Sequence, residues 1–292
     1  MIFVFEYTTC ANDFNGLSSE GLRMFKTLIN SKLKPKSFVR RDLNLNLPKT
    51  SNWREDFVRF LEESEYFLVV APEIDNVLYK LTSKAERMCE NLGSDSKAIE
   101  VTSDKWELYR RLKGKVNVPK TSLKPLDCKF LIKPRMGCDG YGIRFDNDVP
   151  KGYVAQEFVK GENVSVSLLV GEDVEILSGN RQILNGFRYV GFKTPYELDR
   201  EVYEEAIKVV DCIKGLHGYV GVDLVVSDIP FVVDVNARLT TPCIAYGEVY
   251  GIDLLEVIFR NHFGGLKLNL KPLRSVTFYK GVVRCGRAFP TL

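Results

Sequence analysis

Apolar positions in the first hundred residues follow two alternating patterns. Short continuous apolar runs are typical of strands buried on both faces of a parallel sheet, and such runs lie at Ile2–Phe5, Phe38–Val39 and Tyr66–Ala71. Between them, apolar side chains recur every three or four residues, which predicts amphipathic helices. The predicted helices begin at Ser18, Trp53 and Ile74, and the last extends to Leu92. This alternation predicts a small open α/β domain with a parallel sheet over residues 1–98.

Beyond residue 98, short strands and glycine turns replace this pattern. Ser103 is placed to cap a helix over Asp104–Leu112. Strands without crossover helices follow at Lys129–Lys133, Tyr153–Phe158, Val164–Val170, Val174–Leu177 and Phe187–Phe192. The remaining predicted elements are a helix, two strands joined by a tight turn and a further helix, at Leu198–Lys214, Val220–Val226, Phe231–Val235 and Leu254–Phe263. The order predicts antiparallel structure, so the fold class is α/β with an α+β C-terminal part.

Composition and charge exclude several classes of protein. The 292 residues are 45% hydrophobic and 27% charged, which excludes collagen, coiled coil and extended disorder. The formal net charge of +3 is too small and too dispersed for a nucleic-acid surface, although it is compatible with a nucleotide ligand. No apolar run approaches the roughly 18 residues of a membrane span, and the first residues lack the basic region of a signal peptide. We therefore expect a cytoplasmic protein that does not enter a membrane.

Cysteine and histidine usage limits the metal chemistry. The cysteines form no C-x-x-C pair, which favours reduced thiols in a cytoplasmic protein over a zinc site; they are Cys10, Cys89, Cys128, Cys138, Cys212, Cys243 and Cys285. The chain has only two histidines, His217 and His262, so a histidine-rich metal site is excluded. A catalytic role for either histidine is a lesser alternative.

A lysine followed by a glycine-rich loop is the first candidate for nucleotide chemistry. Lys133 ends a predicted strand, and Gly137, Gly140 and Gly142 follow within nine residues. Glycines allow a loop to fold close over phosphates and to offer backbone N–H groups, while a lysine adds a point charge. The spacing is neither a Walker A motif nor a dinucleotide fingerprint. A plain hairpin turn with three glycines explains the segment equally well.

The strand that follows this loop suits an adenosine pocket. Gln156 and Glu157 lie on an apolar strand, and Val159 precedes a glycine turn that is followed by Glu162. Backbone groups at the end of the strand could read the adenine edge, and an acid could reach the ribose hydroxyls. Taken alone, a hairpin with a solvated charged turn is the more economical interpretation.

The strongest candidate site lies on the two strands near the end of the second half. Asp223 stands within a run of valines, where an ionised carboxylate needs compensation. Asp234 and Asn236 share one face of the next strand, because alternate residues of a strand point the same way. Carboxylate and amide oxygens are ligands that Mg²⁺ accepts beside phosphate oxygens. Arg238, on the same face, could hold a phosphoryl group, or it could pair with the two aspartates.

The order of these features along the chain resembles that of an ATP-grasp enzyme, over the whole sequence. The resemblance implies an N-terminal domain (1–98), a lid subdomain (99–158) and a C-terminal subdomain with the metal and substrate site (159–292). It implies ATP and Mg²⁺ or Mn²⁺, with two ions, as cofactors. The residues that it assigns to the nucleotide are Lys105, Lys133, Gly137, Gly140, Gly142, Gln156, Glu157, Val159 and Glu162.

The same resemblance assigns the metal ligands, with two departures. These ligands are Asp223, Asp234 and Asn236. Asp234 stands where most members have glutamate, so its shorter side chain is expected to shift the ion. The acid that contacts the ribose falls one place later in many members, which leaves Glu162 and Asn163 as alternatives.

Shorter motifs resemble one branch of this superfamily, the archaeal tyramine–L-glutamate ligases of methanofuran biosynthesis. They include Glu20-Gly21-x-x-Met24, Ala71-Pro72-Glu73 and Asn180-Arg181-Gln182. The resemblance implies ATP-dependent formation of γ-glutamyltyramine through an acyl phosphate, with Arg181 and Arg238 as catalytic cations and Glu6 and Glu73 as substrate contacts. A ligase for another acid and amine, a phosphotransferase and a non-catalytic nucleotide sensor stay open, as does a homo-oligomer. The expected partners are an amino acid and an amine, and no nucleic acid.

Overall fold

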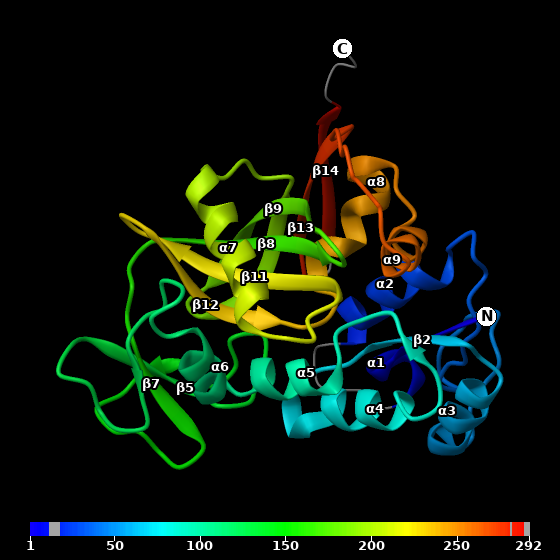
Figure 1. Ribbon diagram of the computed structural model, residues 1–292, viewed down its shortest axis with the longest axis horizontal. Helices are drawn as coiled ribbons and strands as arrows, with labels where there is room; N and C mark the ends of the chain where they lie inside the picture. Colours follow the sequence, from blue (N-terminus) through cyan, green and yellow to red (C-terminus); the bar gives the residue numbers. More distant parts are fainter. Residues whose placement is uncertain (12–17, 281, 289–292) are drawn as a thin grey trace.

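The computed structural model describes residues 1–11, 18–280 and 282–288, with side chains described for 1–11 and 19–280. Its strands form a three-stranded, a four-stranded and a seven-stranded sheet. Figure 1 shows the N-terminal layer at one side, the four-stranded sheet at the other and the large sheet between and above them.

The first sheet is parallel, as the alternation of strand and helix predicts. Its order is β1-β2-β3, with β1 at Ile2–Glu6, β2 at Tyr66–Val70 and β3 at Glu90–Asn91. The helices of this part are α1 (Tyr7–Cys10), α2 (Ser18–Ile29), α3 (Trp53–Glu62), η1 (Ile74–Asn76), α4 (Val77–Ala85) and α5 (Ser96–Ser103). Phenylalanine rings fill its core; Phe5 and Phe57, for example, lie 4.8 Å apart between ring centroids.

Three local predictions in this part are wrong. The helix expected over Ile74–Leu92 is interrupted at both ends, because Asp75 and Asn76 have left-handed backbone angles and the chain after Ala85 turns to add β3 to the sheet. At Phe38–Val39 the chain forms no strand; Val39 forms one isolated bridge, to Lys49. Ser103 ends α5, and the cap of the next helix is Asp104, whose carboxylate accepts the Trp106 and Glu107 backbone N–H groups.

The four-stranded sheet follows helix α6 (Lys105–Leu112). Its order is β4-β7-β5-β6, with β4 at Thr121–Ser122, β5 at Phe130–Pro134, β6 at Arg144–Phe145 and β7 at Tyr153–Glu157. Its buried residues Leu131, Ile132, Val154 and Ala155 belong to neither of the two hydrophobic clusters that fill the rest of the described structure. This sheet therefore has a small core of its own.

The seven-stranded sheet is antiparallel, in the order β12-β11-β8-β9-β10-β13-β14. Its strands are β8 (Glu162–Val170), β9 (Val174–Asn185), β10 (Arg188–Thr194), β11 (Gly218–Val226), β12 (Pro230–Asn236), β13 (Arg274–Tyr279) and β14 (Val282–Ala288). The helices of this part are α7 (Arg200–Cys212), η2 (Thr241–Ala245), α8 (Tyr246–Tyr250) and α9 (Leu254–His262).

The two faces of this sheet differ in character. One face is apolar, with Val164, Val166 and Val222 fully buried, and α7 packs on its strands. Residues of the opposite parity form a polar face, because side chains alternate along a strand. Ser165 lies between Asp223 and Asn180 in the cross-strand register, so these three side chains share that polar face.

Two general features concern membranes and cysteines. Within the described ranges, no helix combines the length and the apolar character needed to cross a membrane. The six cysteines whose side chains are described are free thiols, and Cys285 lies outside the part with described side chains.

Candidate functional site

A cavity of about 230 Å³ lies where the three sheets meet. Its walls come from the end of β1, from α2, from the segment after β2, from the loop after β5 and from the polar face of the seven-stranded sheet. This cavity brings together Lys105, Lys133, Asp223, Asp234, Asn236 and Arg238. Lys105 and Arg238 are 133 positions apart in the sequence, so the fold rather than the local sequence brings these residues together.

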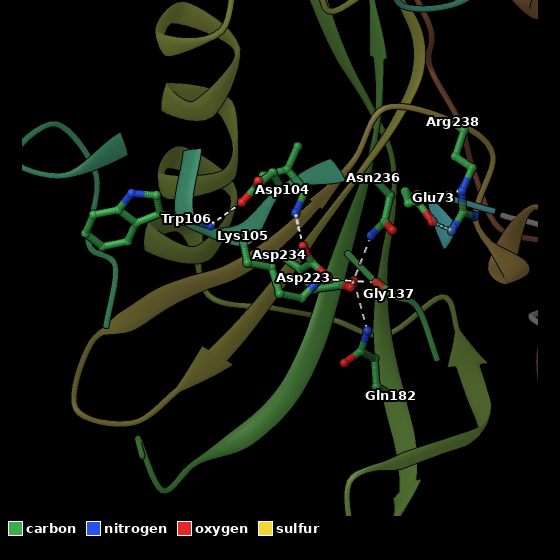
Figure 2. A network of polar contacts seen from close by, with 11 residues as sticks. Glu73, Asp104, Lys105, Trp106, Gly137, Gln182, Asp223, Asp234, Asn236 and Arg238 are labelled. Carbon is green, nitrogen blue, oxygen red and sulfur yellow. Dashed lines mark hydrogen bonds and ion pairs between the residues drawn. The ribbon is translucent and has the colours of Figure 1, made fainter. Parts of the chain in front are cut away.

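Two carboxylates face each other at the centre of the site (Figure 2). Asp223 on β11 and Asp234 on β12 are direct partners in the antiparallel register. The Asp223 carboxylate accepts one hydrogen bond from Asn236 Nδ2 at 3.2 Å and another from Gln182 Nε2 at 2.9 Å. Burial and the neighbouring Asp234 charge raise the pKa of Asp223 to about 7. The pair is therefore an acidic centre that favours positive charge.

Two buried lysines approach this centre. Lys105 begins α6, and its Nζ lies 3.1 Å from Asp234 Oδ2 and 3.2 Å from the Gly137 carbonyl oxygen. Burial opposes the charge of Lys105, but the Asp234 carboxylate prevails and raises its pKa. Burial also lowers the pKa of Lys133 to about 8, a shift that Asp234 limits and Lys105 reinforces. The lysines thus supply two cations where the nearby charge is negative.

Arg238 is held by Glu73 rather than by the aspartates. Its Nε and Nη2 donate to the two Glu73 carboxylate oxygens at 2.7 and 2.8 Å, and Nη1 donates to the Leu239 carbonyl oxygen. Both side chains are about nine-tenths buried. The Arg238–Glu73 pair joins the N-terminal part to the segment after β12 and orients the guanidinium at the cavity wall.

The glycine-rich loop folds against the hairpin between β9 and β10. Gly140 has a φ of +71°, and a Cβ there would lie 1.8 Å from the Phe187 carbonyl oxygen. Gly142 has a φ of +76°, and its Cβ would meet Pro134 at 2.9 Å. Glycine is therefore required at both positions. The cavity wall includes Gly137 and Gly140 but not Gly142.

The expected adenosine segment connects the four-stranded sheet to the seven-stranded one. Gln156 is buried and donates from Nε2 to Thr121 Oγ1, and the Glu157 carboxylate accepts the Lys120 N–H at 3.4 Å. Val159 follows in the link between β7 and β8. These residues lie outside the cavity wall, so their contact with adenine remains a prediction.

Between the two alternatives for the ribose contact, the structure places Asn163 in the cavity wall. Glu162 points to the other face of β8, where Arg181 Nε lies 3.0 Å from its Oε1 and the Tyr196 hydroxyl donates to the same oxygen. Because Arg181 contacts Glu162 on that face, the sheet lies between Arg181 and the acidic centre. The Arg181 side chain is half exposed.

Glu6 lies in the cavity wall, and its carboxylate stabilises the start of α1. Its carboxylate caps α1 by accepting the N–H groups of Thr8 and Thr9 at 3.0 and 2.8 Å, and it also accepts both threonine hydroxyls. The side chain is buried, and burial raises its pKa. Its oxygens are therefore already occupied by donors from the same turn.

Sequence reasoning missed Gln182, which donates to Asp223. The motif Asn180-Arg181-Gln182 was noted for its arginine, but period two places its outer two residues on the polar face and the arginine on the other. Asn180 is fully buried and donates to Ser167 Oγ at 3.1 Å. The alternation of side chains along β9 could have identified Gln182, because it places Gln182 on the same face of the sheet as Asp223.

The donor set fits a divalent cation that also binds a phosphate chain. Mg²⁺ requires about six oxygen ligands, and two carboxylates with one amide provide too few. Across the described ranges, no group of three or more His, Cys, Asp or Glu side chains could hold a metal ion. Burial and, after it, the charge of Asp234 raise the pKa of Asp223, and a bound cation would offset both effects. The residues present therefore fit a cation whose remaining ligands come from a nucleotide.

Comparisons with known proteins agree with this geometry. An ATP-grasp domain model matches residues 102–242, and a pre ATP-grasp 3 domain model matches residues 27–99. The chain is 36% identical over 281 residues to the tyramine–L-glutamate ligase of Methanocaldococcus fervens, covering 89% of this chain and 94% of the relative. It is 35% identical over 282 residues to the corresponding protein of Methanocaldococcus jannaschii, covering 89% of each.

A solved structure gives the same result for the fold. An ATP-grasp superfamily protein from Archaeoglobus fulgidus superposes with a TM-score of 0.87 at 46% sequence identity, covering 95% of this chain and 91% of that one. The fold expected from the order of the motifs is thereby confirmed.

Proposed function

The chain belongs to the ATP-grasp family, and on this premise we propose that it joins L-glutamate to tyramine, forming γ-glutamyltyramine, ADP and phosphate. The observation that carries the choice of substrates is the 36% identity to the M. fervens tyramine–L-glutamate ligase over 89% of this chain. The acidic centre, the buried lysines and Arg238 support the ligase chemistry independently of that name.

The nucleotide and its ions occupy the acidic centre in this proposal. Asp223, Asp234 and Asn236 would hold two Mg²⁺ or Mn²⁺ ions, which would neutralise the charge of the phosphate oxygens. Lys105 and Lys133 contact the phosphates next to this centre. The loop that contains Gly137 and Gly140 lines the cavity and offers its backbone N–H groups to the phosphates.

The reaction proceeds through an acyl phosphate. A γ-carboxylate oxygen of glutamate attacks the terminal phosphorus of ATP, and ADP leaves. The ammonium group first loses one proton to solvent, and the amine nitrogen then attacks the acyl carbon. The C–N bond forms, the C–O bond to phosphate breaks, and the nitrogen loses a second proton to the departing phosphate, so that the amide keeps one N–H. Arg238, fixed by Glu73, neutralises the transferred phosphoryl group, and the protein contributes chiefly by positioning and by charge.

The test is a product assay with the purified protein, Mg-ATP, L-glutamate and tyramine. We expect ADP and phosphate to form in equal amounts, and mass spectrometry to detect γ-glutamyltyramine. An aliphatic amine of similar length is the matched control, and we expect it to react more slowly. Equal rates with both amines, or ADP formation without an amide, would contradict the assignment of substrates. Release of a phosphorylated product would indicate the phosphotransferase alternative.

A further inference from the structure

Glu20 is a buried carboxylate of the cavity wall that the proposed reaction does not yet use. It lies in the first turn of α2 and is 5% exposed. Met24 lies one helical turn further, on the same face of α2, and also lines the cavity. The wall of the same cavity includes Val70 at the end of β2, and Ala71 and Pro72 after it. A cavity lined by a carboxylate and by apolar side chains suits a ligand that has both a positively charged group and an apolar part.

The oxygens of Glu20 are incompletely satisfied. Oε2 accepts a long hydrogen bond of 3.4 Å from Thr241 Oγ1. Oε1 is buried and forms no hydrogen bond within the described part of the chain; its contact is an ion pair with Lys280 Nζ at 3.3 Å. A buried carboxylate oxygen without a hydrogen bond is unfavourable. Glu20 is therefore held by two long contacts only, and the ammonium group of a ligand could replace that of Lys280.

Lys280 is shared between this carboxylate and the glycine-rich loop. Its Nζ donates to Asp139 Oδ2 at 2.6 Å, a shorter contact than the one to Glu20. Asp139 lies between Gly137 and Gly140, so the lysine connects the wall to the loop. Lys280 thus presents a primary ammonium group to Glu20 from within the protein.

The other carboxylates of the described wall each have a polar contact of 3.1 Å or less, shorter than the two contacts of Glu20; they are Glu6, Asp139, Asp223 and Asp234. Glu6 accepts hydrogen bonds from four donor groups of its own turn. Asp223 accepts from Gln182 and Asn236, and Asp234 is paired with Lys105 and belongs to the cation site. Among the described residues of the wall, Glu20 is consequently the acid best able to receive a new cation.

We propose that Glu20 binds the ammonium group of the attacking amine, and that Lys280 occupies this position while no amine is bound. This inference rests on the proposed ligase function and adds the site of the amine. An arylalkyl amine matches the wall, since its ammonium group meets Glu20 while its ring lies along Met24 and the apolar segment after β2. L-Glutamate fits the part of the cavity next to Glu20 poorly, because its carboxylates would be repelled by Glu20 and Asp139.

The experiment measures binding and turnover separately. Calorimetry with tyramine in the presence of Mg-ADP tests the site, and the product assay tests the reaction. We expect Glu20→Gln to raise the Kd and the KM for tyramine by about tenfold, because glutamine still accepts a hydrogen bond but lacks the charge that makes a hydrogen bond to an ammonium group stronger. The KM values for ATP and L-glutamate should stay within about twofold, and Glu62→Gln on the exposed surface of α3 is the matched control.

Two further variants separate this role from a merely structural one. Lys280→Met removes the competing ammonium group, so it should lower the KM for tyramine several-fold. Asp139→Asn frees Lys280 to pair with Glu20 alone, so it should raise that KM. An increase in the KM for tyramine in Lys280→Met, or an effect of Glu20→Gln on L-glutamate instead of tyramine, would overturn the proposal.

The outcomes also distinguish this proposal from the proposed function. Glu20-dependent binding of tyramine without amide formation would reject the reaction and keep the ammonium site. Amide formation from tyramine with an unchanged Kd and KM in Glu20→Gln would keep the reaction and reject the site.

Discussion

Replacing Glu73 by glutamine tests whether the buried Arg238–Glu73 pair orients the arginine for catalysis. Glutamine keeps the shape of the side chain but removes its charge and one of its two acceptor oxygens. Arg238 would then lie about nine-tenths buried without a counter-charge. Burial works against the guanidinium, and the Glu73 carboxylate more than compensates, so that the pKa of Arg238 is raised.

The expected loss of stability follows from this burial. Removing one partner of a buried ion pair destabilises a protein by roughly 3–5 kcal/mol, because the other charge is left uncompensated. We expect Glu73→Gln to lie at the lower end, about 3 kcal/mol, since the glutamine oxygen can still accept one hydrogen bond. This is a large share of the roughly 5–15 kcal/mol by which a protein is stable.

Urea unfolding, followed by circular dichroism, measures the change, with initial rates of ADP formation recorded on the folded variant. The matched control is Glu204→Gln, which breaks the exposed Arg200–Glu204 pair on α7. That change should cost less than about 1 kcal/mol, because exposed ion pairs contribute little. The double variant Glu73→Gln/Arg238→Met should regain most of the lost stability while staying inactive. A loss below 1 kcal/mol in Glu73→Gln with an unchanged kcat would refute the reasoning.

The remaining predictions concern the cation site and the loop. Asp234→Asn should reduce turnover by orders of magnitude while thermal melting still shows a cooperative transition; wild-type rates would mean that Asp234 is not a metal ligand. Gln182→Met should weaken Mg²⁺ activation by about 10–100-fold, as the loss of a residue that orients a ligand does; an unchanged Mg²⁺ titration would contradict this role. Hydrogen exchange of the peptide that covers residues 135–142 should slow on addition of Mg-ADP, and no change would favour a plain hairpin.

Local patterns predicted those parts of the fold and site that depend on neighbours in the chain. Period two placed Asp234 and Asn236 on one face of a strand, and the tight turn before them brought Asp223 opposite Asp234. The register of β11 with β12 confirms these inferences, because they depend only on the alternation of side chains and on one short hairpin.

The errors arose where distant segments decide the local structure. The chain after Ala85 leaves the helix because β3 can pair with β2, and that edge is formed by residues far earlier in the sequence. Arg181 carries a charge that suits catalysis, yet the pairing of β9 with β8 turns it toward Glu162 and directs Gln182 to Asp223. The alternation along a single strand shows which residues share a face, but it does not show which of the two faces lines the site.

The cavity balances its charges between different parts of the chain, and this has a consequence for binding. Lys105 on α6 pairs with Asp234 on β12, and Lys280 after β13 pairs with Glu20 on α2. Under our proposals, a metal–nucleotide complex competes for Asp234 and an amine competes for Glu20. Each ligand therefore replaces an ion pair that connects two segments of the cavity wall. Ligand binding and the packing of these segments against each other are coupled, because both depend on the same few ion pairs. The Arg238–Glu73 pair differs, because under our proposal its two hydrogen bonds are kept when the phosphoryl group binds. It can hold the N-terminal part in place while the contacts around it exchange.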